Sequence, residues 1–213
     1  MSARASIVIP IRSLSDGKTR LSPVLDPGER SALTREMLER VVRAALATVS
    51  RAEVVVISPD PDALAEVGRI DPSIRLLFQD HERPGLNPAL EQASAAVREA
   101  GVSTVLILPA DLPLISSADI DNLLRRDAPV VIAPDRHGMG TNALMVRLDA
   151  FGEPFVFQFG EESYGKHHDE AARLGVDAMT AMAPGTSFDL DTPADLAELD
   201  AMRVTPGARQ GAR

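Results

Sequence analysis

Short apolar runs alternate with helical patterns along most of this chain, and this alternation constrains the fold more than any other feature of the sequence. Residues 6–9 and 54–57, for example, are short β-branched runs that predict buried strands. Between them, Asp26 and Pro27 open a helix that runs to about residue 49, with the capping residues typical of an N-terminus. Repeated strand–helix–strand units predict an α/β fold with a parallel sheet between two layers of helices. Ligands of such sheets bind at the carboxyl ends of the strands, where the strand order reverses.

The remaining elements follow from the same signals. Further strands are expected at 74–78, 102–108, 129–133, 142–146, 176–182 and 188–190, and further helices at 62–67, 87–100, 116–125 and 161–174. Thr192 and Asp195 form a capping box that begins a last helix. We expect one domain over residues 1–204 and a disordered tail over residues 205–213, which are rich in Gly, Pro and Arg.

Composition narrows the classes of function. The chain has no cysteine, which excludes disulfides, thiolate metal sites and a cysteine nucleophile, and fits a reducing cytoplasm. Its net charge is −9 and only 3% of its residues are aromatic, so it lacks the basic and stacking surfaces of nucleic-acid-binding proteins. No apolar stretch is long enough for a signal peptide or a membrane helix, so we expect no membrane partner.

The segment after the first strand has a high density of positive charge. Arg12, Lys18 and Arg20 lie within nine residues, and Lys18 is one of two lysines in the chain. The segment lies where a doubly wound sheet binds its ligand. A lysine ammonium suits contact with phosphate as a point charge, and a nearby guanidinium suits bidentate contact. We favour phosphate binding over the alternative of a solvated polar loop.

Two acidic positions far apart in sequence are candidates for one metal site. Asp111 follows the strand at 102–108 and is predicted to project into the crevice, where a carboxylate is a good Mg²⁺ ligand beside phosphates. The alternative for Asp111 is a turn residue ahead of the next helix. Asp189 and Asp191 share one face of an extended segment. We interpret Asp189 as the second metal ligand and Asp191 as a partner of the next helix dipole.

A third candidate site surrounds the start of the helix predicted at 161–174. Gly160 precedes this helix, whose free N–H groups would attract an anion. Ser163, Lys166 and His167 could complete that pocket, although a plain surface helix fits the same residues.

Two further polar residues have alternative interpretations. Thr141 offers a hydroxyl after Gly138 and Gly140, which let backbone approach a ligand closely, but a tight hairpin turn explains the glycines equally well. Asn87 either caps its helix or presents its amide to a base or a ribose.

Together these segments resemble the phosphoenolpyruvate and 2-phospho-L-lactate guanylyltransferases of coenzyme F-420 biosynthesis, over roughly residues 5–200. The motifs, in chain order, are the lysine loop at 10–21, Gly-Leu-Asn-Pro-Ala-Leu at 85–90, Pro-Ala-Asp-Leu-Pro at 109–113, Asp-Arg at 135–136 with Gly-Thr at 140–141, Phe-Gly-Glu-Glu-Ser at 159–163 with His167, and Asp-Leu-Asp-Thr-Pro at 189–193. The resemblance implies a three-layer, Rossmann-like fold of the nucleotide-diphospho-sugar-transferase type, with a mostly parallel sheet that contains an antiparallel strand. It also implies GTP as the donor and Mg²⁺ as the cofactor.

The resemblance gives roles to residues at the nucleotide side of the site. Asp111 and Asp189 would hold the metal ion and act in catalysis. Lys18 and Arg20 would bind the triphosphate, Lys18 with a catalytic role as well, and Asn87 would contact the nucleotide.

The resemblance also gives roles to residues at the acceptor side. Thr141, Gly160 and Ser163 would bind the phosphorylated acceptor. Arg12 stands where members of the family often have lysine, which keeps the charge but changes the donor geometry, so Arg12 is left out of the predicted site.

The implied reaction joins GTP and phosphoenolpyruvate to give enolpyruvoyl-2-diphospho-5'-guanosine and pyrophosphate. The acceptor phosphate is already anionic, so positioning and charge neutralisation suffice and no catalytic base is required. Alternative acceptors are 2-phospho-L-lactate and 3-phosphoglycerate, because the three acids differ by groups worth about 1–3 kcal/mol in a pocket. More distant alternatives are another small-molecule nucleotidyltransferase, such as a CTP-dependent one, and a non-catalytic nucleotide-binding member.

Overall fold

The computed structural model describes residues 4–15 and 17–204, so the tail predicted to be disordered lies outside the described residues. The strands are β1 (Ala5–Pro10), β2 (Glu53–Ser58), β3 (Arg75–Phe78), β4 (Thr104–Ile107), β5 (Val130–Pro134), β6 (Thr141–Arg147) and β7 (Ala178–Thr180). The helices are α1 (Pro27–Leu46), α2 (Pro61–Ile70), α3 (Leu86–Glu99), α4 (Ser117–Leu124), α5 (Ser163–Arg173) and α6 (Pro193–Val204), with a 3₁₀ turn, η1, at Thr19–Leu21.

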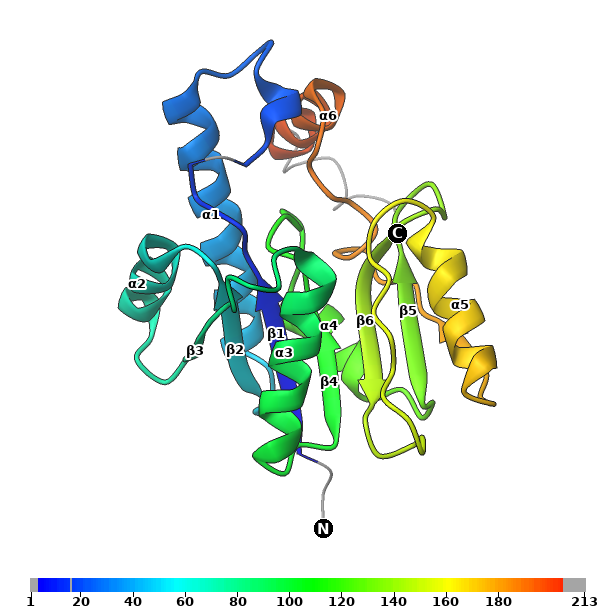
Figure 1. Cartoon of the computed structure of the whole chain (residues 1–213). Coiled ribbons are helices and arrows are strands. Elements are labelled where there is room, and N and C mark those ends of the chain that lie inside the picture. The colour runs from blue at the N-terminus through cyan, green and yellow to red at the C-terminus, as the bar shows by residue number, and fades with distance from the viewer. Residues whose placement is uncertain (1–3, 16, 205–213) are drawn as a thin grey trace.

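The described strands form one sheet in the order β3-β2-β1-β4-β6-β5-β7 (Figure 1). Strand β1 pairs in parallel with both β2 and β4, whereas β6 is antiparallel to its neighbours β4 and β5. The chain runs from β1 to β2 and β3 on one side, and then returns to place β4 on the other side of β1. The strand order therefore reverses at β1, and the predicted mostly parallel sheet with an antiparallel strand is confirmed.

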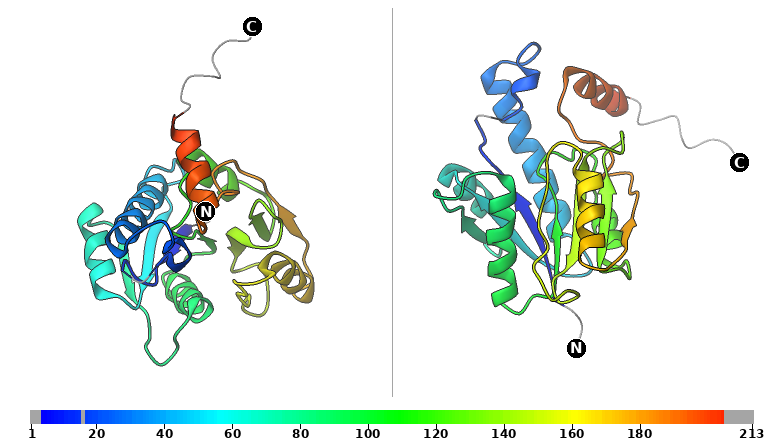
Figure 2. Two further views of the ribbon diagram at one scale, coloured as in Figure 1. Left: turned by 90° about the horizontal axis from the view of Figure 1, so that it is seen from above. Right: turned by 45° about the vertical axis from the view of Figure 1, so that its right-hand side comes forward.

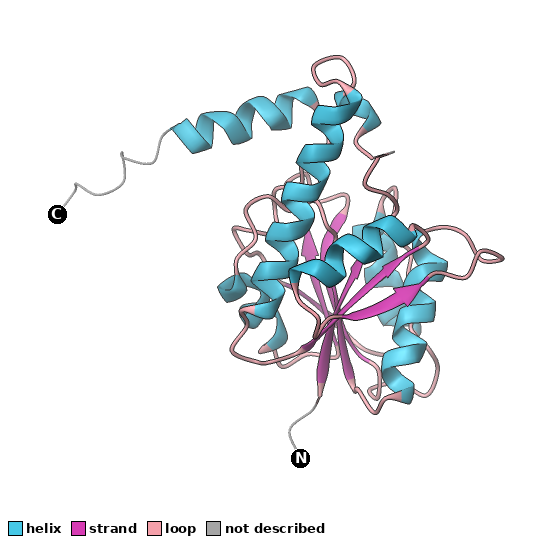
Figure 3. Ribbon diagram, turned by 90° about the vertical axis from the view of Figure 1, so that its left-hand side faces the viewer, coloured by secondary structure: helices cyan, strands magenta, loops and turns pink. Residues whose placement is uncertain are grey.

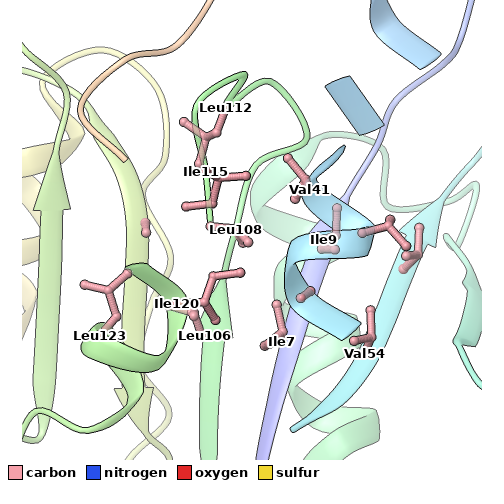
Figure 4. Close-up of a cluster of buried hydrophobic side chains, with 14 of the residues drawn as sticks. Ile7, Ile9, Val41, Val54, Leu106, Leu108, Leu112, Ile115, Ile120 and Leu123 are labelled. Atoms are coloured by element: carbon pink, nitrogen blue, oxygen red, sulfur yellow. The ribbon is translucent and has the colours of Figure 1, made fainter. Parts of the chain in front are cut away.

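The alternation of side chains along β1 divides the core into two layers. Ile7 and Ile9 belong to an apolar cluster with residues of α1, α2 and α4, which Figure 4 shows in close-up. Val8 points the other way, into a cluster with residues of α3 and α5. Helices therefore cover both faces of the sheet, as Figure 3 shows. This is the predicted three-layer arrangement.

A third apolar cluster lies beyond the carboxyl ends of the parallel strands. Its buried members come from η1, α1, α6 and the segment before α6: Leu21, Leu33, Met37, Phe188, Leu190 and Leu199. Arg203 on α6 also forms an ion pair with Glu36 on α1, with 2.6 Å between Nη2 and Oε1. Figure 2 shows α6 above the sheet, beside the N-terminal part of α1.

This cluster corrects one prediction. Residues 188–190 are not a strand, because Phe188 and Leu190 bury their side chains against α1 and α6 instead of joining the sheet. Their apolar alternation predicts a buried extended segment, which the structure confirms, but this segment packs on helices and not in a sheet. The strand predicted at 176–182 is shortened to β7 at the sheet edge.

The predicted capping boxes are present. Asp26 accepts a hydrogen bond from the Glu29 N–H, and the Glu29 carboxylate accepts one from the Asp26 N–H, each over 2.8 Å. At the start of α6, the Asp195 carboxylate accepts from the Thr192 N–H over 2.7 Å, and Thr192 Oγ1 accepts from the Asp195 N–H over 3.3 Å. These local bonds satisfy N–H groups that a helix N-terminus leaves unpaired.

Helix α1 ends at Leu46, earlier than the predicted end near residue 49. The reason is a tertiary contact that the local pattern does not contain. The buried carboxylate of Asp121, on α4, accepts hydrogen bonds from the N–H groups of Val49 and Ser50 over 3.0 and 3.2 Å. These bonds fix the turn that leads from α1 into β2.

We expect Asp121→Ala to lower the free energy of unfolding by about 2 kcal/mol, because it removes two charge-assisted hydrogen bonds from a buried position. The matched control is Asp127→Ala, since Asp127 is an exposed carboxylate whose ion pair with Arg147 spans 3.2 Å. An exposed pair contributes less than about 1 kcal/mol. Urea unfolding of both variants measures the difference, and equal losses of stability would contradict the role given to Asp121.

Candidate active site

A cleft of about 880 Å³ opens at the carboxyl ends of β1 and β4. This is the switch point at which the fold predicts a ligand site. One wall is the segment after β1, including Arg12, Lys18 and Arg20, and Asp111 lies in the wall that follows β4. The remaining side is lined by residues of the connection from β3 to α3 and by the first residue of α3: Gln79, Asp80, His81, Pro84, Gly85 and Leu86. The structure thus brings the predicted phosphate-binding residues and one predicted metal ligand into a single cleft.

Lys18 lies between two carboxylates in this cleft. Its Nζ donates to Asp111 Oδ2 over 2.9 Å and to Asp191 Oδ1 over 2.8 Å. The Lys18 side chain is only 10% exposed, whereas the two carboxylates are 34% and 42% exposed. Lys18 also has a left-handed backbone conformation, with φ of 55°, which is uncommon for a residue with a side chain. The two ion pairs help to hold this conformation.

The charges around Lys18 keep it protonated. Burial by itself would lower the pKa of the Lys18 ammonium, but the negative charges and hydrogen bonds of Asp111 and Asp191 outweigh burial and raise that pKa. An ammonium group has three N–H donors. Two of them donate to the carboxylates, and within the described ranges 4–15 and 17–204 the third has no partner, so it is available to an anionic ligand in the cleft.

Asp189 lies close to the same carboxylates. The Leu190 N–H donates to the carbonyl oxygen of Asp111 over 3.2 Å, which holds the two predicted metal-binding segments against each other. Burial raises the pKa of the Asp189 carboxyl, a hydrogen bond from Asn142 opposes this, and the negative charges of Asp111 and Asp191 raise it further. The predicted proximity of Asp111 and Asp189, which are far apart in sequence, is present.

The structure corrects the interpretation of Asp191. We interpret this residue from sequence as a partner of the helix dipole, but its carboxylate contacts Lys18 and lies 3.7 Å from Arg20 Nη1. The helix-capping carboxylate is Asp195 instead. The spacing of two residues between Asp189 and Asp191 indicates that both side chains lie on one face of the segment. No local pattern could show the contact with Lys18, which is far away along the chain.

The predicted acceptor residues lie around the start of β6 and α5. Thr141 and Ser163 are buried, whereas Gly160 is exposed. The Tyr164 N–H donates to the carbonyl oxygen of Met139 over 3.0 Å, which joins the start of α5 to the loop before β6. Gly160 has a φ of +127°, a conformation that strongly favours glycine. Phe159, the residue before Gly160, lines the cleft.

Three details of the predicted anion pocket differ from the sequence interpretation. The Ser163 and Tyr164 N–H groups already donate to backbone carbonyls, those of Gly160 and Met139, so the helix start offers fewer free donors than predicted. The exposed Lys166 ammonium donates to the carbonyl oxygen of Glu161 over 2.7 Å. His167 is completely buried, and its two ring nitrogens already contact Thr141 and the Gln158 N–H, so neither is left for an anion.

Asn87 has a role that neither sequence interpretation contained. It lies inside the first turn of α3 and is not the N-cap, which is Gly85. Its side chain holds the backbone of Phe159, since Oδ1 accepts from the Phe159 N–H over 2.8 Å and Nδ2 donates to the Phe159 carbonyl over 3.1 Å. Asn87 thereby fixes the segment that leads from the cleft to Gly160.

Neither a preformed metal site nor a membrane-spanning helix is found among the described residues. Among residues 4–15 and 17–204, no group of three or more His, Cys, Asp or Glu side chains is arranged to hold a metal ion. Within the same ranges, none of the helices combines the length and the apolar composition that a bilayer crossing requires.

Comparison with known proteins identifies the family. The sequence model described as "Guanylyl transferase CofC like" matches residues 5–203. The chain belongs to the CofC-like guanylyl transferase family. A phosphoenolpyruvate guanylyltransferase of Rubrobacter xylanophilus is 43% identical over 200 residues, which cover 91% of this chain and 92% of that protein. A 2-phospho-L-lactate guanylyltransferase of Methanothermobacter thermautotrophicus is 38% identical over 90% of this chain and 82% of its own length.

A solved structure with a similar fold supports the predicted architecture. This structure, from Desulfovibrio desulfuricans, is described as a "putative nucleotide-diphospho-sugar transferase", and it superimposes on this chain with a TM-score of 0.78. It covers 99% of this chain and 92% of that one at 17% sequence identity. At this identity the likeness concerns the fold alone, and it agrees with the nucleotide-diphospho-sugar-transferase-like architecture predicted from the sequence motifs.

The burial of His167 predicts a pH-dependent stability. Burial lowers the pKa of the His167 imidazole to about 4, Glu170 opposes that shift and His168 adds to it, while the ordinary histidine value is 6.5. Between these two pKa values the unfolded chain binds more protons than the folded chain. The stability that the neutral His167 contributes is therefore fully present above pH 6.5 and is lost as the pH falls towards 4. The loss amounts to about 3 kcal/mol.

The measurement is the free energy of unfolding against pH for the wild-type chain and for His167→Gln, which cannot gain a proton in this range. Carboxylates titrate in both proteins, so only the difference between the two curves reports His167. A difference that does not change between pH 7 and pH 4 would contradict the neutral, buried imidazole.

Proposed function

We propose that this chain transfers the guanylyl group of GTP to phosphoenolpyruvate, giving enolpyruvoyl-2-diphospho-5'-guanosine and pyrophosphate in coenzyme F-420 biosynthesis. The single observation that carries the proposal is the cluster of Lys18, Asp111 and Asp191 at the strand switch point, with Asp189 beside it, in a chain of the CofC-like family. A cytoplasmic location, which the cysteine-free composition favours, belongs to the same proposal.

The proposed roles at the nucleotide side follow from the charges in the cleft. Lys18 presents its third N–H to a phosphate oxygen, and Arg20, whose side chain is 76% exposed, adds a bidentate donor. Together they bind the triphosphate and offset the charge that develops on the leaving pyrophosphate. Asn87 acts on the nucleotide side by holding the Phe159 backbone at the cleft wall.

The residues also fit a Mg²⁺ ion. Arg12, Lys18 and Arg20 line the cleft together with the carboxylates of Asp80, Asp111 and Asp191. Asp189 interacts electrostatically with Asp111 and Asp191, so the site has no surplus positive charge to accept a triphosphate. Mg²⁺ prefers one or two carboxylates together with substrate phosphates, and Asp111 and Asp189 are proposed as those carboxylates. When bound, the ion would neutralise phosphate charge and align the donor and acceptor oxygens.

The chemical step needs no base from the protein. A phosphate oxygen of the acceptor forms a bond to the α-phosphorus of GTP, and the bond from that phosphorus to the bridging oxygen of the β-phosphate breaks. Thr141, Gly160 and Ser163 are proposed to bind the acceptor, which brings two anions together in the orientation for in-line transfer. The acceptor 2-phospho-L-lactate remains the second candidate, because a relative with that activity in its name is 38% identical.

The decisive experiment is mass spectrometry of the product formed from GTP, Mg²⁺ and phosphoenolpyruvate, 2-phospho-L-lactate and 3-phosphoglycerate in competition. The enolpyruvoyl product is expected in excess. Pyrophosphate release with each of the four nucleoside triphosphates tests the donor. Release with CTP in place of GTP would point to another nucleotidyltransferase, and GTP binding without pyrophosphate release would point to a non-catalytic protein.

We expect Asp111→Asn and Asp189→Asn each to lower kcat at least ~100-fold, because each removes a carboxylate from the proposed cation site, a dominant electrostatic term. Asp127→Asn is the matched control, since Asp127 has a 98% exposed side chain. Steady-state kinetics measures the effect, and thermal unfolding verifies the fold of each variant. Turnover near the wild-type value in either variant would remove that aspartate from the proposed site.

We expect Lys18→Ala to raise the KM for GTP roughly tenfold or more, because a charged hydrogen bond to the triphosphate is lost. Lys166→Ala removes the other lysine of the chain, whose exposed ammonium contacts a backbone carbonyl, and should leave the KM for GTP unchanged. The comparison of the two KM values is the measurement. An unchanged value in Lys18→Ala would return its segment to the solvated-loop interpretation.

A further inference from the structure

A short backbone segment, residues 158–160, is held from two sides at the border between the cleft and the proposed acceptor site. Asn87 on α3 binds both the N–H and the carbonyl of Phe159. On the other side, the Gln158 N–H donates to Nε2 of His167, on α5, over 3.0 Å. His167 thus holds this segment in place. Its other ring nitrogen, Nδ1, contacts Thr141, one of the residues proposed to bind the acceptor.

The bond from Gln158 determines which ring nitrogen of His167 carries a proton. A backbone N–H can only donate, so Nε2 must be an unprotonated acceptor. A neutral imidazole then carries its hydrogen on Nδ1, which lies 3.0 Å from Thr141 Oγ1. His167 is therefore the donor in this pair and Thr141 the acceptor. Burial of the ring beside Phe159, at 4.8 Å between ring centroids, favours the same neutral form.

This assignment determines the polarity of the Thr141 hydroxyl. Since Oγ1 accepts from His167, the hydroxyl hydrogen must point elsewhere. Within residues 4–15 and 17–204, Thr141 Oγ1 has no second hydrogen-bond partner. The next residue of β6, Asn142, donates to Asp189, so the start of β6 lies beside the segment that carries this proposed metal ligand. Thr141 is consequently an oriented, unused donor, suited to an anionic oxygen.

We infer that His167 is a positioning residue that fixes the Thr141 hydroxyl as a hydrogen-bond donor to an anionic oxygen of the phosphorylated acid. This inference rests on the proposed function for the location of the acceptor. His167 does not bind the acceptor itself, because both of its ring nitrogens are used by Thr141 and by the Gln158 N–H. Through Gln158 the same ring also holds the segment that carries Gly160, so one side chain aligns two of the proposed acceptor contacts.

Two substitutions of His167 separate its two hydrogen bonds. In His167→Asn, the side-chain amide nitrogen occupies the position of Nδ1 and can still donate to Thr141. In His167→Gln, the longer side chain places its terminal group at the position of Nε2, where its oxygen can accept from Gln158, but it has no donor at the position of Nδ1. Thr141→Val removes the hydroxyl at almost constant volume and serves as the reference.

The primary measurement is the Kd of phosphoenolpyruvate by calorimetry, which needs no turnover. We expect Thr141→Val and His167→Gln each to weaken binding about tenfold, the effect of one hydrogen bond to a charged group. The double variant should be no weaker than either single variant, because both remove the same interaction. His167→Asn should retain most of the affinity, and the KM for GTP should stay within about twofold in all of them.

Several outcomes would overturn the inference. Equal loss of affinity in His167→Asn and His167→Gln, with unchanged melting temperatures, would make His167 a general structural residue. Effects of Thr141→Val and His167→Gln that multiply in the double variant would place them in separate interactions. ¹⁵N NMR of the free wild-type chain gives an independent readout, and a protonated Nε2 would exclude the assigned tautomer.

These results differ from a failure of the proposed function. If the wild-type chain binds phosphoenolpyruvate but forms no guanylylated product, the proposed activity fails, while the pattern of affinities among the His167 variants still decides the positioning role. If the wild-type chain does not bind phosphoenolpyruvate, 2-phospho-L-lactate or 3-phosphoglycerate, the location of the acceptor fails and the inference fails with it.

Discussion

The site depends on one buried lysine that holds three distant parts of the chain together. Lys18 follows β1, Asp111 follows β4, and Asp191 precedes α6. Their meeting point is where the strand order reverses, so the ion pairs both close the top of the sheet and define one wall of the cleft. Removing one member of such a partly buried cluster leaves an uncompensated charge, which costs more than an exposed ion pair would.

The same charges explain how an acidic chain can accept anionic substrates. The net charge is −9, but salt screens the interaction between exposed charges beyond about 8 Å. Inside the cleft, the carboxylates are matched by Lys18 and the two arginines nearby, and the balance is local. A triphosphate and a phosphorylated acid together would tip this balance towards negative charge. The proposed Mg²⁺ ion follows from that imbalance.

The acceptor side is organised by neutral hydrogen bonds instead of ion pairs. Asn87 and His167 form hydrogen bonds to the backbone at residues 158–159 from opposite sides. His167 donates its single ring N–H to Thr141. Each of these groups has a single compatible hydrogen-bonding arrangement, so the network fixes donor directions before any ligand binds. Such preorganisation favours orientation of the substrate over simple attraction.

The sequence by itself determined the elements with local causes. The β-branched runs, the capping boxes at Asp26 and Thr192, and the motifs of the CofC-like family depend on neighbours a few residues apart. They suffice to predict the α/β layers, the location of the site and the pairing of the Asp111 and Asp189 segments. Only the tertiary structure decided that residues 188–190 pack on helices, that Asp191 forms an ion pair with Lys18, and that His167 forms a hydrogen bond with Thr141. Burial, and the direction of a hydrogen bond between residues far apart in the chain, arise from packing and leave no mark on local sequence patterns.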